Sequence, residues 1–385
     1  MLLLHAADLH LGKTLHERDI SEDQEAMLEG LLGLLADRRP AALLLAGDLY
    51  DRSIPPPEAV RLFDSFLSRA AEADPGLVVV AIPGNHDSAA RLSFGTRLMS
   101  RSGVHIRTLP EDCDEPVLVE REGEATAIWP LPFLGSGAFD SKAGKPRGQA
   151  ELFSEALRRI GEKLASPDRP GRGARNVLLA HCFAAGGTAS ESERAFVGQS
   201  EQVDSGAFDA FDYVALGHLH RFQKVGGKAR YAGSPLAYSF AEGDEPKGFV
   251  LVDLKKEGGF EAELLPFVPL RRMRRVEGPF SALSAPGSYP EYRDDFVGAF
   301  LTDPEPVLNP ADPLRAVFPN LLAVRQAAFE LAQPRAGAAS LPLDGPRSLA
   351  EDFAAFHVEM KGESPDETTS ELFSSLVREA EHAAL

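Results

Sequence analysis

Five short polar clusters carry side chains that bind divalent metal ions, and each cluster follows an apolar run. They are Asp8-Leu-His10, Gly47-Asp48-Leu-Tyr-Asp51, Gly84-Asn-His-Asp87, His181 and Gly217-His218-Leu-His220. Aspartate, asparagine and neutral histidine offer oxygen and imidazole ligands that suit Mn, Fe(II) or Zn. In an extended segment the D-x-H and H-x-H spacings put both donors on one side, because side chains alternate with period two. The candidate ligands are more numerous than one ion with an open position needs: Asp8, His10, Asp48, Asn85, His181, His218 and His220.

Each cluster taken alone has a simpler interpretation. An isolated D-x-H after a strand is usually a surface turn, and Gly-Asp in that place is mostly a turn signal. The conjunction favours a metal site, because five of the ten histidines fall in these clusters. Gly47, Gly84 and Gly217 also stand where each strand is expected to turn sharply, which a residue without Cβ permits. The remaining histidines are interpreted as strand, loop or helix-face residues: His5, His16, His105, His357 and His382.

The apolar runs predict buried strands, and the stretches between them predict helices. Strands are expected at residues 2–7, 42–46, 77–82, 177–180 and 213–216. Apolar residues recur at helical spacing over 22–37 and 57–73. This alternation is typical of parallel pairing in a mixed α/β sheet, where ligands gather beyond the carboxyl ends of the strands. We therefore expect the five clusters to converge on one site. Shorter strands at 231–234, 248–254 and 260–265 are expected to form a second sheet.

Length and charge limit the classes of protein to which this chain can belong. With 385 residues the chain favours two or three domains, and 44% hydrophobic with 25% charged residues is typical of globular proteins. The formal charge of −18 argues against a protein that coats nucleic acid through phosphate contacts alone. It leaves a nuclease open, because bound divalent ions can dominate the field of a site.

The sequence also bears on the compartment. No apolar run reaches the roughly 18 residues that a membrane span needs, and no signal-peptide pattern is present. The two cysteines, Cys113 and Cys182, show no disulfide or thiolate-zinc motif. We therefore expect a cytoplasmic protein without a membrane segment.

In this order the five clusters closely resemble the motifs of the calcineurin-like metallophosphoesterase superfamily, and in particular its bacterial nucleases for repair of DNA double-strand breaks. The matching segments are 4–13, 46–51, 84–88, 215–221 and 231–235. The resemblance is specific over roughly residues 1–265 and rests mainly on layout beyond them. It implies an α/β fold with two mixed β-sheets flanked by helices (an αββα sandwich), a small α+β capping domain and C-terminal helices.

The resemblance implies three parts: a metallophosphoesterase nuclease domain at 1–268, a small capping, DNA-binding domain at 269–345, and a C-terminal helical, ATPase-binding segment at 346–385. The prolines of 302–313 and the Pro/Gly-rich stretch 333–347 are typical of loops that bound a small domain. Strands are expected in the small domain at 295–301 and 321–326. The cluster Arg271-Arg-Met-Arg-Arg275 is either a phosphate-contacting patch or a solvated interdomain linker, and the sequence favours neither.

Residues 348–385 predict two amphipathic helices. The first has an apolar stripe made of Leu349, Phe353, Phe356 and Met360, and the second has an apolar face made of Leu372, Phe373, Leu376, Val377 and Ala380. The second helix is expected to begin with Ser364 as its N-cap, Pro365 at its first position and Glu367 completing a capping box. Both helices either pack on the nuclease core or dock a partner. The resemblance favours docking, with an SMC-like ATPase as the partner.

By the same resemblance two divalent ions are bound, with Mn²⁺ as the expected metal. The first ion would be held by Asp8, His10, Asp48 and His220, and the second by Asp48, Asn85, His181 and His218, so that Asp48 bridges. Two catalytic residues are implied outside these sets. His86 would assist the leaving oxygen, and the carboxylate of Asp51 would pair with His86 and raise the pKa of its ring. Archaeal and eukaryotic relatives often have histidine at the position of Asp51.

The function implied is a DNA nuclease that acts as a 3′→5′ exonuclease on duplexes and as an endonuclease on single strands and hairpins. Its implied partners are DNA and the ATPase, with a homodimer inside a heterotetramer. A metallophosphatase or cyclic-nucleotide phosphodiesterase with the same dinuclear core is the alternative. The roughly 120 residues after Leu265 count against it, because those enzymes usually have one domain. A third possibility, a scaffold that has lost its metals, conflicts with the retention of every ligand type and of His86.

Overall fold

The computed structural model describes residues 1–135, 138–139, 148–190 and 202–327, together with scattered residues from 353 to 375. The chain divides into two compact units, Met1–Ala328 and Phe329–Leu385, which are treated separately.

The first sheet has six strands in the order β14-β13-β1-β4-β5-β6. Their bounds are β1 (Leu2–Ala6), β4 (Ala42–Ala46), β5 (Val78–Ile82), β6 (Val104–Ile106), β13 (Gly248–Leu254) and β14 (Phe260–Pro266). Strands β1, β4, β5 and β6 run parallel, whereas β13 is antiparallel to β1 and β14 is antiparallel to β13. The parallel strands are almost uninterrupted apolar runs because both faces of this sheet are covered.

The second sheet also has six strands, in the order β11-β12-β10-β9-β8-β7. Their bounds are β7 (Val117–Arg121), β8 (Glu124–Leu131), β9 (Arg175–His181), β10 (Tyr213–Gly217), β11 (Gln223–Val225) and β12 (Ala229–Tyr231). Strands β8, β9, β10 and β12 are parallel, and the edge strands β7 and β11 are antiparallel to their neighbours. Glu122 and Gly123 join β7 to β8 with positive φ angles of 53° and 79°, as a type I′ turn requires.

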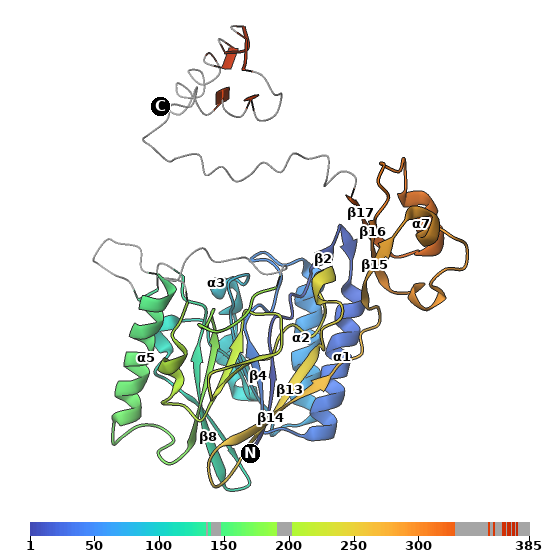
Figure 1. Ribbon diagram of the computed structural model, residues 1–385. Helices are drawn as coiled ribbons and strands as arrows, with labels where there is room; N and C mark the ends of the chain where they lie inside the picture. The colour runs from blue at the N-terminus through green and yellow to red at the C-terminus, as the bar shows by residue number, and fades with distance from the viewer. Residues whose placement is uncertain are drawn as a thin grey trace. The chain divides into compact units, whose positions relative to one another are not determined.

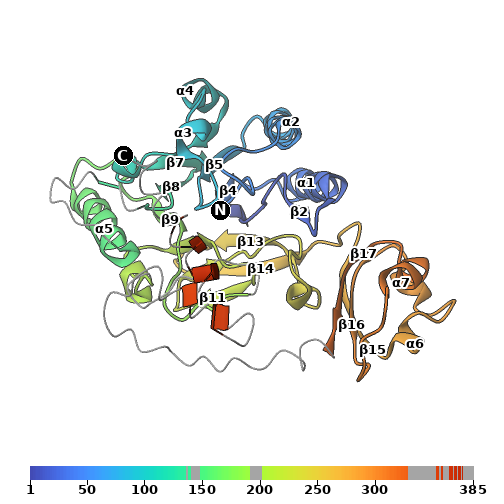
Figure 2. The same cartoon turned by 90° about the horizontal axis from the view of Figure 1, so that it is seen from above.

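The two sheets lie face to face with helices on their outer faces (Figures 1 and 2). A core that includes Leu3, Leu44, Val80 and Leu179 fills the space between them. Helices α1 (Ser21–Arg38) and α2 (Pro57–Ala73) cover the first sheet, and α5 (Gln149–Ala165) covers the second. The short helices α3 (Ala89–Leu92) and α4 (Thr96–Met99) follow β5. This arrangement confirms the αββα sandwich. In the part of the chain that the structure describes, no helix is long and apolar enough to cross a membrane.

The prediction that 248–254 and 260–265 belong to a second sheet is wrong. Both segments form strands within a residue of the expected bounds, but β13 pairs with β1 and extends the first sheet. The pairing joins Leu2 to Asp253. An apolar pattern predicts a strand, but it does not predict which distant strand pairs with it. The segments β6, β7, β8 and α5 were not predicted.

A smaller sheet follows the sandwich. It consists of the parallel strands β15 (Met273–Gly278), β16 (Phe296–Leu301) and β17 (Leu321–Gln326), with helices α6 (Phe280–Leu283) and α7 (Ala311–Val317). It has its own core, built on residues such as Val297, Leu314 and Phe318. The hairpin β2 (Thr14–Leu15) and β3 (Arg18–Asp19) completes the unit. The domain boundaries at 268 and 345 stay predictions.

The arginine cluster at 271–275 runs into β15 and is largely engaged in ion pairs. Arg271 pairs with Glu22 and Asp23 of α1, Arg274 pairs with Asp295, and Arg275 pairs with Glu277. Three of the cluster's four charges therefore have protein partners, while Arg272 and Arg275 are exposed to solvent.

Most of the predicted C-terminal helices, at 348–385, lies outside the described residues. Among those described, the rings of Phe353 and Phe373, one from each predicted apolar face, stack with their centroids 4.1 Å apart. The second helix begins differently from the prediction. Asp366, and not Ser364, is the N-cap, because its Oδ1 accepts the backbone N–H of Thr369 at 2.8 Å.

Candidate metal centre

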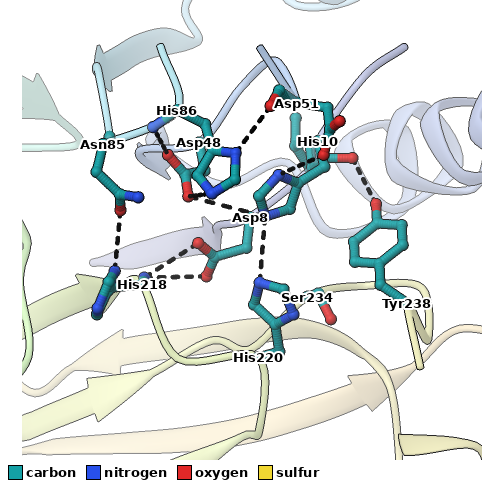
Figure 3. A network of polar contacts seen from close by, with 12 residues as sticks. Asp8, His10, Asp48, Asp51, Asn85, His86, His218, His220, Ser234 and Tyr238 are labelled. Atoms are coloured by element: carbon teal, nitrogen blue, oxygen red, sulfur yellow. Dashed lines mark hydrogen bonds and ion pairs between the residues drawn. The ribbon is translucent and has the colours of Figure 1, made fainter. Parts of the chain in front are cut away.

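The seven predicted ligands and His86 come together at the carboxyl ends of five strands drawn from both sheets. Figure 3 labels all of them except His181, whose Nε2 lies 3.6 Å from Oδ2 of Asp48. Those from the first sheet follow β1, β4 and β5, and those from the second sheet end or follow β9 and β10. The predicted convergence on one site is therefore what the geometry shows. Their assignment as ligands stays a prediction.

Four of these residues have backbone conformations that L-amino acids rarely adopt. The φ angles of Asp8, His10, Asp48 and His218 are 53°, 45°, 49° and 108°. Such residues persist only where their surroundings over-determine them, and they cluster at functional sites. Here the backbone N–H groups of Asp8 and His10 donate to the carbonyl oxygens of Gly47 and Asp48, at 3.0 and 2.9 Å.

Two glycines are required at the site for different reasons. Gly47 has a φ of 87°, which supports the predicted sharp turn after β4. Gly84 has no such angle; a Cβ there would collide with the carboxylate and backbone of Asp48. Gly84 is therefore required for the close approach of two loops and not for a turn.

The carboxylate of Asp48 lies at the centre. Its Oδ1 accepts the backbone N–H of His86 at 2.8 Å. Its Oδ2 lies 3.7 Å from Nε2 of His10 and 3.6 Å from Nε2 of His181. Two ligands about 2.0–2.2 Å from the same ion lie no more than about 4.4 Å apart, so these distances suit shared coordination.

The other predicted ligands form two groups beside Asp48. In the first, Nε2 of His10 and Nε2 of His220 are 3.1 Å apart, and both rings lie with Asp8 in a set whose ligand atoms are all within 4.8 Å of one another. In the second, Oδ1 of Asn85 is 3.0 Å from Nε2 of His181 and 3.0 Å from Nδ1 of His218. Asp8 and Asp48 also lie with His181 in a further set of possible ligands, so the assignment of each residue to one of two ions stays a prediction.

Burial keeps the histidines in their metal-binding form. Loss of hydration lowers the pKa of His10 to about 4 and that of His218 to about 3, and it also lowers the pKa values of His181 and His220. The rings are thus neutral at physiological pH and offer lone pairs. Neutral imidazoles, two carboxylates and an amide oxygen are a donor set that fits Mn, Fe(II) or Zn.

His86 differs from the ligands in its exposure. Its side chain is 18% exposed, against 2% for His10 and 0% for His181. Its Nε2 lies 4.0 Å from Oδ2 of Asp48, and its ring also joins His10 and Asp48 in a possible ligand set. The geometry alone is therefore compatible with either role for His86.

The predicted pairing of His86 with the carboxylate of Asp51 needs correction. Nδ1 of His86 faces the backbone carbonyl oxygen of Asp51 at 2.8 Å. The carboxylate turns instead to Nζ of Lys13 at 2.6 Å and Nδ1 of His10 at 3.4 Å. Partial burial raises the pKa of Asp51, but these contacts outweigh it and hold that pKa below its usual range. A full positive charge on Lys13 attracts the carboxylate more strongly than a neutral ring does.

Asp87 is a supporting residue that the sequence analysis left without a role. Its carboxylate accepts the backbone N–H groups of Leu49, Tyr50 and Gly84 at 2.9–3.0 Å, which ties the loop after β4 to the loop after β5. Burial and the nearby charge of Asp48 raise the pKa of Asp87. A bound cation would relieve this repulsion. The position of Asp87 in the motif Gly84-Asn-His-Asp87 could have indicated this supporting role.

Two further supporting residues carried no signal in the sequence. Gln24 on α1 donates from Nε2 to the carbonyl oxygen of His10 at 2.7 Å. Glu242, fully buried, has Oε1 3.8 Å from Nδ1 of His220. Both lie outside the polar clusters, so only the fold brings them to the site.

Comparison with known proteins finds a matching family model, two curated relatives and a solved structure that are similar to this chain. A family model described as Calcineurin-like phosphoesterase matches residues 1–222. Two curated proteins, named as the D component of the nuclease SbcCD in Staphylococcus epidermidis and Staphylococcus saprophyticus, are each 30% identical to this chain, over 332 and 336 residues. Each alignment covers 86% of this chain and 86% of the relative. A solved dimetal phosphatase from Danio rerio is 12% identical over 69% of this chain and 98% of its own, with a TM-score of 0.43, which carries no weight for function.

Asp87→Asn should lower the free energy of unfolding of the metal-free protein by about 1–3 kcal/mol, because an amide NH₂ would face a backbone N–H donor. Urea unfolding in the presence of chelator measures this. Asp64→Asn, at an exposed position on α2, should stay within about 0.5 kcal/mol of the unaltered protein. Equal losses for both variants would contradict the role of Asp87 as a tie between the loops.

Proposed function

The chain belongs to the calcineurin-like phosphoesterase family, and on that basis we propose that it is a metal-dependent DNA nuclease. The observation that carries the proposal is the convergence of candidate ligands, most of them buried, around Asp48. The names of the two curated relatives support a nuclease over a phosphatase. Exonuclease activity on duplexes and endonuclease activity on single strands and hairpins belong to the same proposal.

The ligand sets proposed are those expected from the sequence. Asp8, His10, Asp48 and His220 would hold one ion, and Asp48, Asn85, His181 and His218 the other, with Mn²⁺ as the proposed metal. When bound, two such ions would supply Lewis-acid charge to the phosphodiester and would lower the pKa of a water nucleophile.

The protein's own groups would orient the phosphodiester and protonate its leaving oxygen. The carbonyl oxygen of Asp51 accepts the Nδ1 proton of His86, which leaves Nε2 directed towards the centre. His86 is more exposed than the buried rings around it, so a phosphodiester can reach it. When protonated, Nε2 can donate to a phosphate oxygen or to the leaving oxygen. Asp51 would act on His10 through its carboxylate and on His86 through its backbone.

Asp48→Ala should abolish both DNA hydrolysis and high-affinity Mn²⁺ binding, whereas His86→Ala should keep the metal and lose turnover by about 10²–10⁴-fold. The assay is cleavage of plasmid and hairpin DNA with Mn²⁺ or chelator, alongside metal analysis of each variant. An Asp48→Ala enzyme that still cleaves would refute the bridging assignment. Faster hydrolysis of a small chromogenic phosphodiester than of DNA would favour the phosphatase alternative.

We also propose that the protein forms a homodimer through the segment that contains α3 and α4. Phe94 is 91% exposed and Leu98 is 68% exposed, four residues apart in this segment. Large apolar side chains exposed together are typical of an interface.

Light scattering after gel filtration should give twice the monomer mass for the unaltered chain and a shift to the monomer for Phe94→Ser. Leu308→Ser, at an equally exposed leucine elsewhere, should leave the dimer intact. A dimer that survives Phe94→Ser would place the interface on another surface.

The second proposed partner is an SbcC-type ATPase, bound by the C-terminal helices. The separate compactness of Phe329–Leu385 supports a segment that can dock independently. Residues 348–385 carry nine acidic and two basic side chains. This charge favours helices with one polar face towards solvent and one apolar face that binds a partner.

Deletion of residues 348–385 should leave a folded nuclease that binds Mn²⁺ but no longer co-purifies with the ATPase. Circular dichroism and metal analysis check the fold, and co-purification checks the contact. An insoluble truncated protein would indicate that the helices belong to the nuclease core, and full binding would indicate a contact elsewhere.

A further inference from the structure

One candidate ligand, His220, has a buried carboxylate behind it. Glu242 ends the 3₁₀ helix η5 (Phe240–Glu242), which lies between β12 and β13, and it is fully buried. Its Oε1 is 3.8 Å from Nδ1 of His220, while Nε2 of the same ring faces His10 at 3.1 Å (Figure 3 shows the second contact). The two ring nitrogens therefore point in different directions, one to the metal centre and one to the carboxylate.

Glu242 is held in place by several donors. Nζ of Lys247 lies 2.7 Å from its Oε2, and the hydroxyl of Ser239 donates to its Oε1 at 2.9 Å. Lys247 also donates to the carbonyl oxygen of His220 at 2.8 Å and to the hydroxyl of Ser234 at 3.0 Å. One ammonium group thus fixes both the carboxylate and the backbone of the histidine that the carboxylate faces.

The same short segment contacts the smaller sheet formed by β15, β16 and β17, which we call the capping sheet. Phe240, two residues before Glu242, packs against Gly298 of β16, where a Cβ would collide with its ring. Its ring also meets that of Phe300 edge to face, with the centroids 6.2 Å apart. Gly243, directly after Glu242, packs so closely on the carbonyl oxygen of Met273 in β15 that a side chain would not fit. Residues 240–243 are therefore held between the capping sheet and the metal centre.

We propose that Glu242 is a positioning residue for His220 and that the capping sheet, through Phe240, helps to fix it there. Histidines that bind a metal through one nitrogen commonly donate the other N–H to a carboxylate, which sets the tautomer and the orientation of the ring. The capping sheet thereby influences metal binding without supplying a ligand. The proposal rests on the proposed function in one respect, namely that His220 binds metal.

The test is calorimetric titration of Mn²⁺ into the metal-free, full-length protein. Glu242→Gln should weaken binding by about 10–100-fold at one of two sites, the usual effect of losing such a carboxylate. Glu242→Asp, which keeps the charge, should recover part of the loss. The visible spectrum of bound Co²⁺ should change in Glu242→Gln, because that spectrum reports the ligand geometry and a merely structural role would not alter it.

Phe240→Ala tests the capping contact, and it should weaken binding in the same direction by about 2- to 30-fold. Asp244→Asn, an exposed acid in the same segment, should leave the titration unchanged. If Glu242→Gln fails to fold because Lys247 loses its partner, the double variant with Lys247→Met removes both charges and takes its place.

The outcomes separate this proposal from the proposed function. An unaltered protein that binds no Mn²⁺ would overturn both. Normal binding by the unaltered protein with equal affinity and an unchanged Co²⁺ spectrum in Glu242→Gln would overturn only the role of Glu242. A Phe240→Ala variant that binds as tightly as the unaltered protein would overturn the part assigned to the capping sheet.

Discussion

The close approach of the two sheets at their carboxyl ends is the constraint on which the candidate metal centre depends. The backbone N–H of His218 donates to both carboxylate oxygens of Asp8 at 3.0 and 3.1 Å, and Nδ1 of His181 lies 2.8 Å from the carbonyl oxygen of Ala46. A Cβ on Gly217 would collide with that same carbonyl. Because protein interiors are packed as densely as organic crystals, a shift of one sheet would move its ligands as a group.

For the proposed nuclease, this arrangement would also explain how an acidic chain acts on a polyanion. With a formal charge of −18 the surface offers little general attraction for phosphate. The arginines at 271, 274 and 275 are paired with acidic side chains of the protein itself. In the proposed function, attraction for the substrate would therefore come mainly from the ions bound between the two sheets, at the place where hydrolysis is proposed.

The sequence was informative wherever a local pattern decides the outcome. Strands β4, β13 and β17 and helix α2 have the predicted bounds, because each is an apolar run or a helical repeat with a clear end. Motif spacing located all seven candidate ligands, since each ends a strand or follows one within about four residues. The local patterns did not predict which distant segments contact one another. The pairing of β13 with β1 and the approach of Glu242 to His220 join segments that no local pattern connects. The contact of the Asp51 carboxylate with Lys13 was missed because two basic partners compete for it and the fold decides between them.

The contact between His10 and His220 joins residues 210 positions apart, and this separation has a consequence during synthesis. Ribosomes add roughly 5–20 residues per second, so the interval between Asp87 and His218 lasts roughly 7–26 s. During this interval β1, β4 and β5 can form while the second sheet, which covers Leu44 and Val80 on the inner face of theirs, is still incomplete. When Asp87 has been added, four of the seven candidate ligands exist without the other three. A nascent chain of this protein is thus exposed to aggregation, and to capture of metal by an incomplete site, until β10 has emerged and docked.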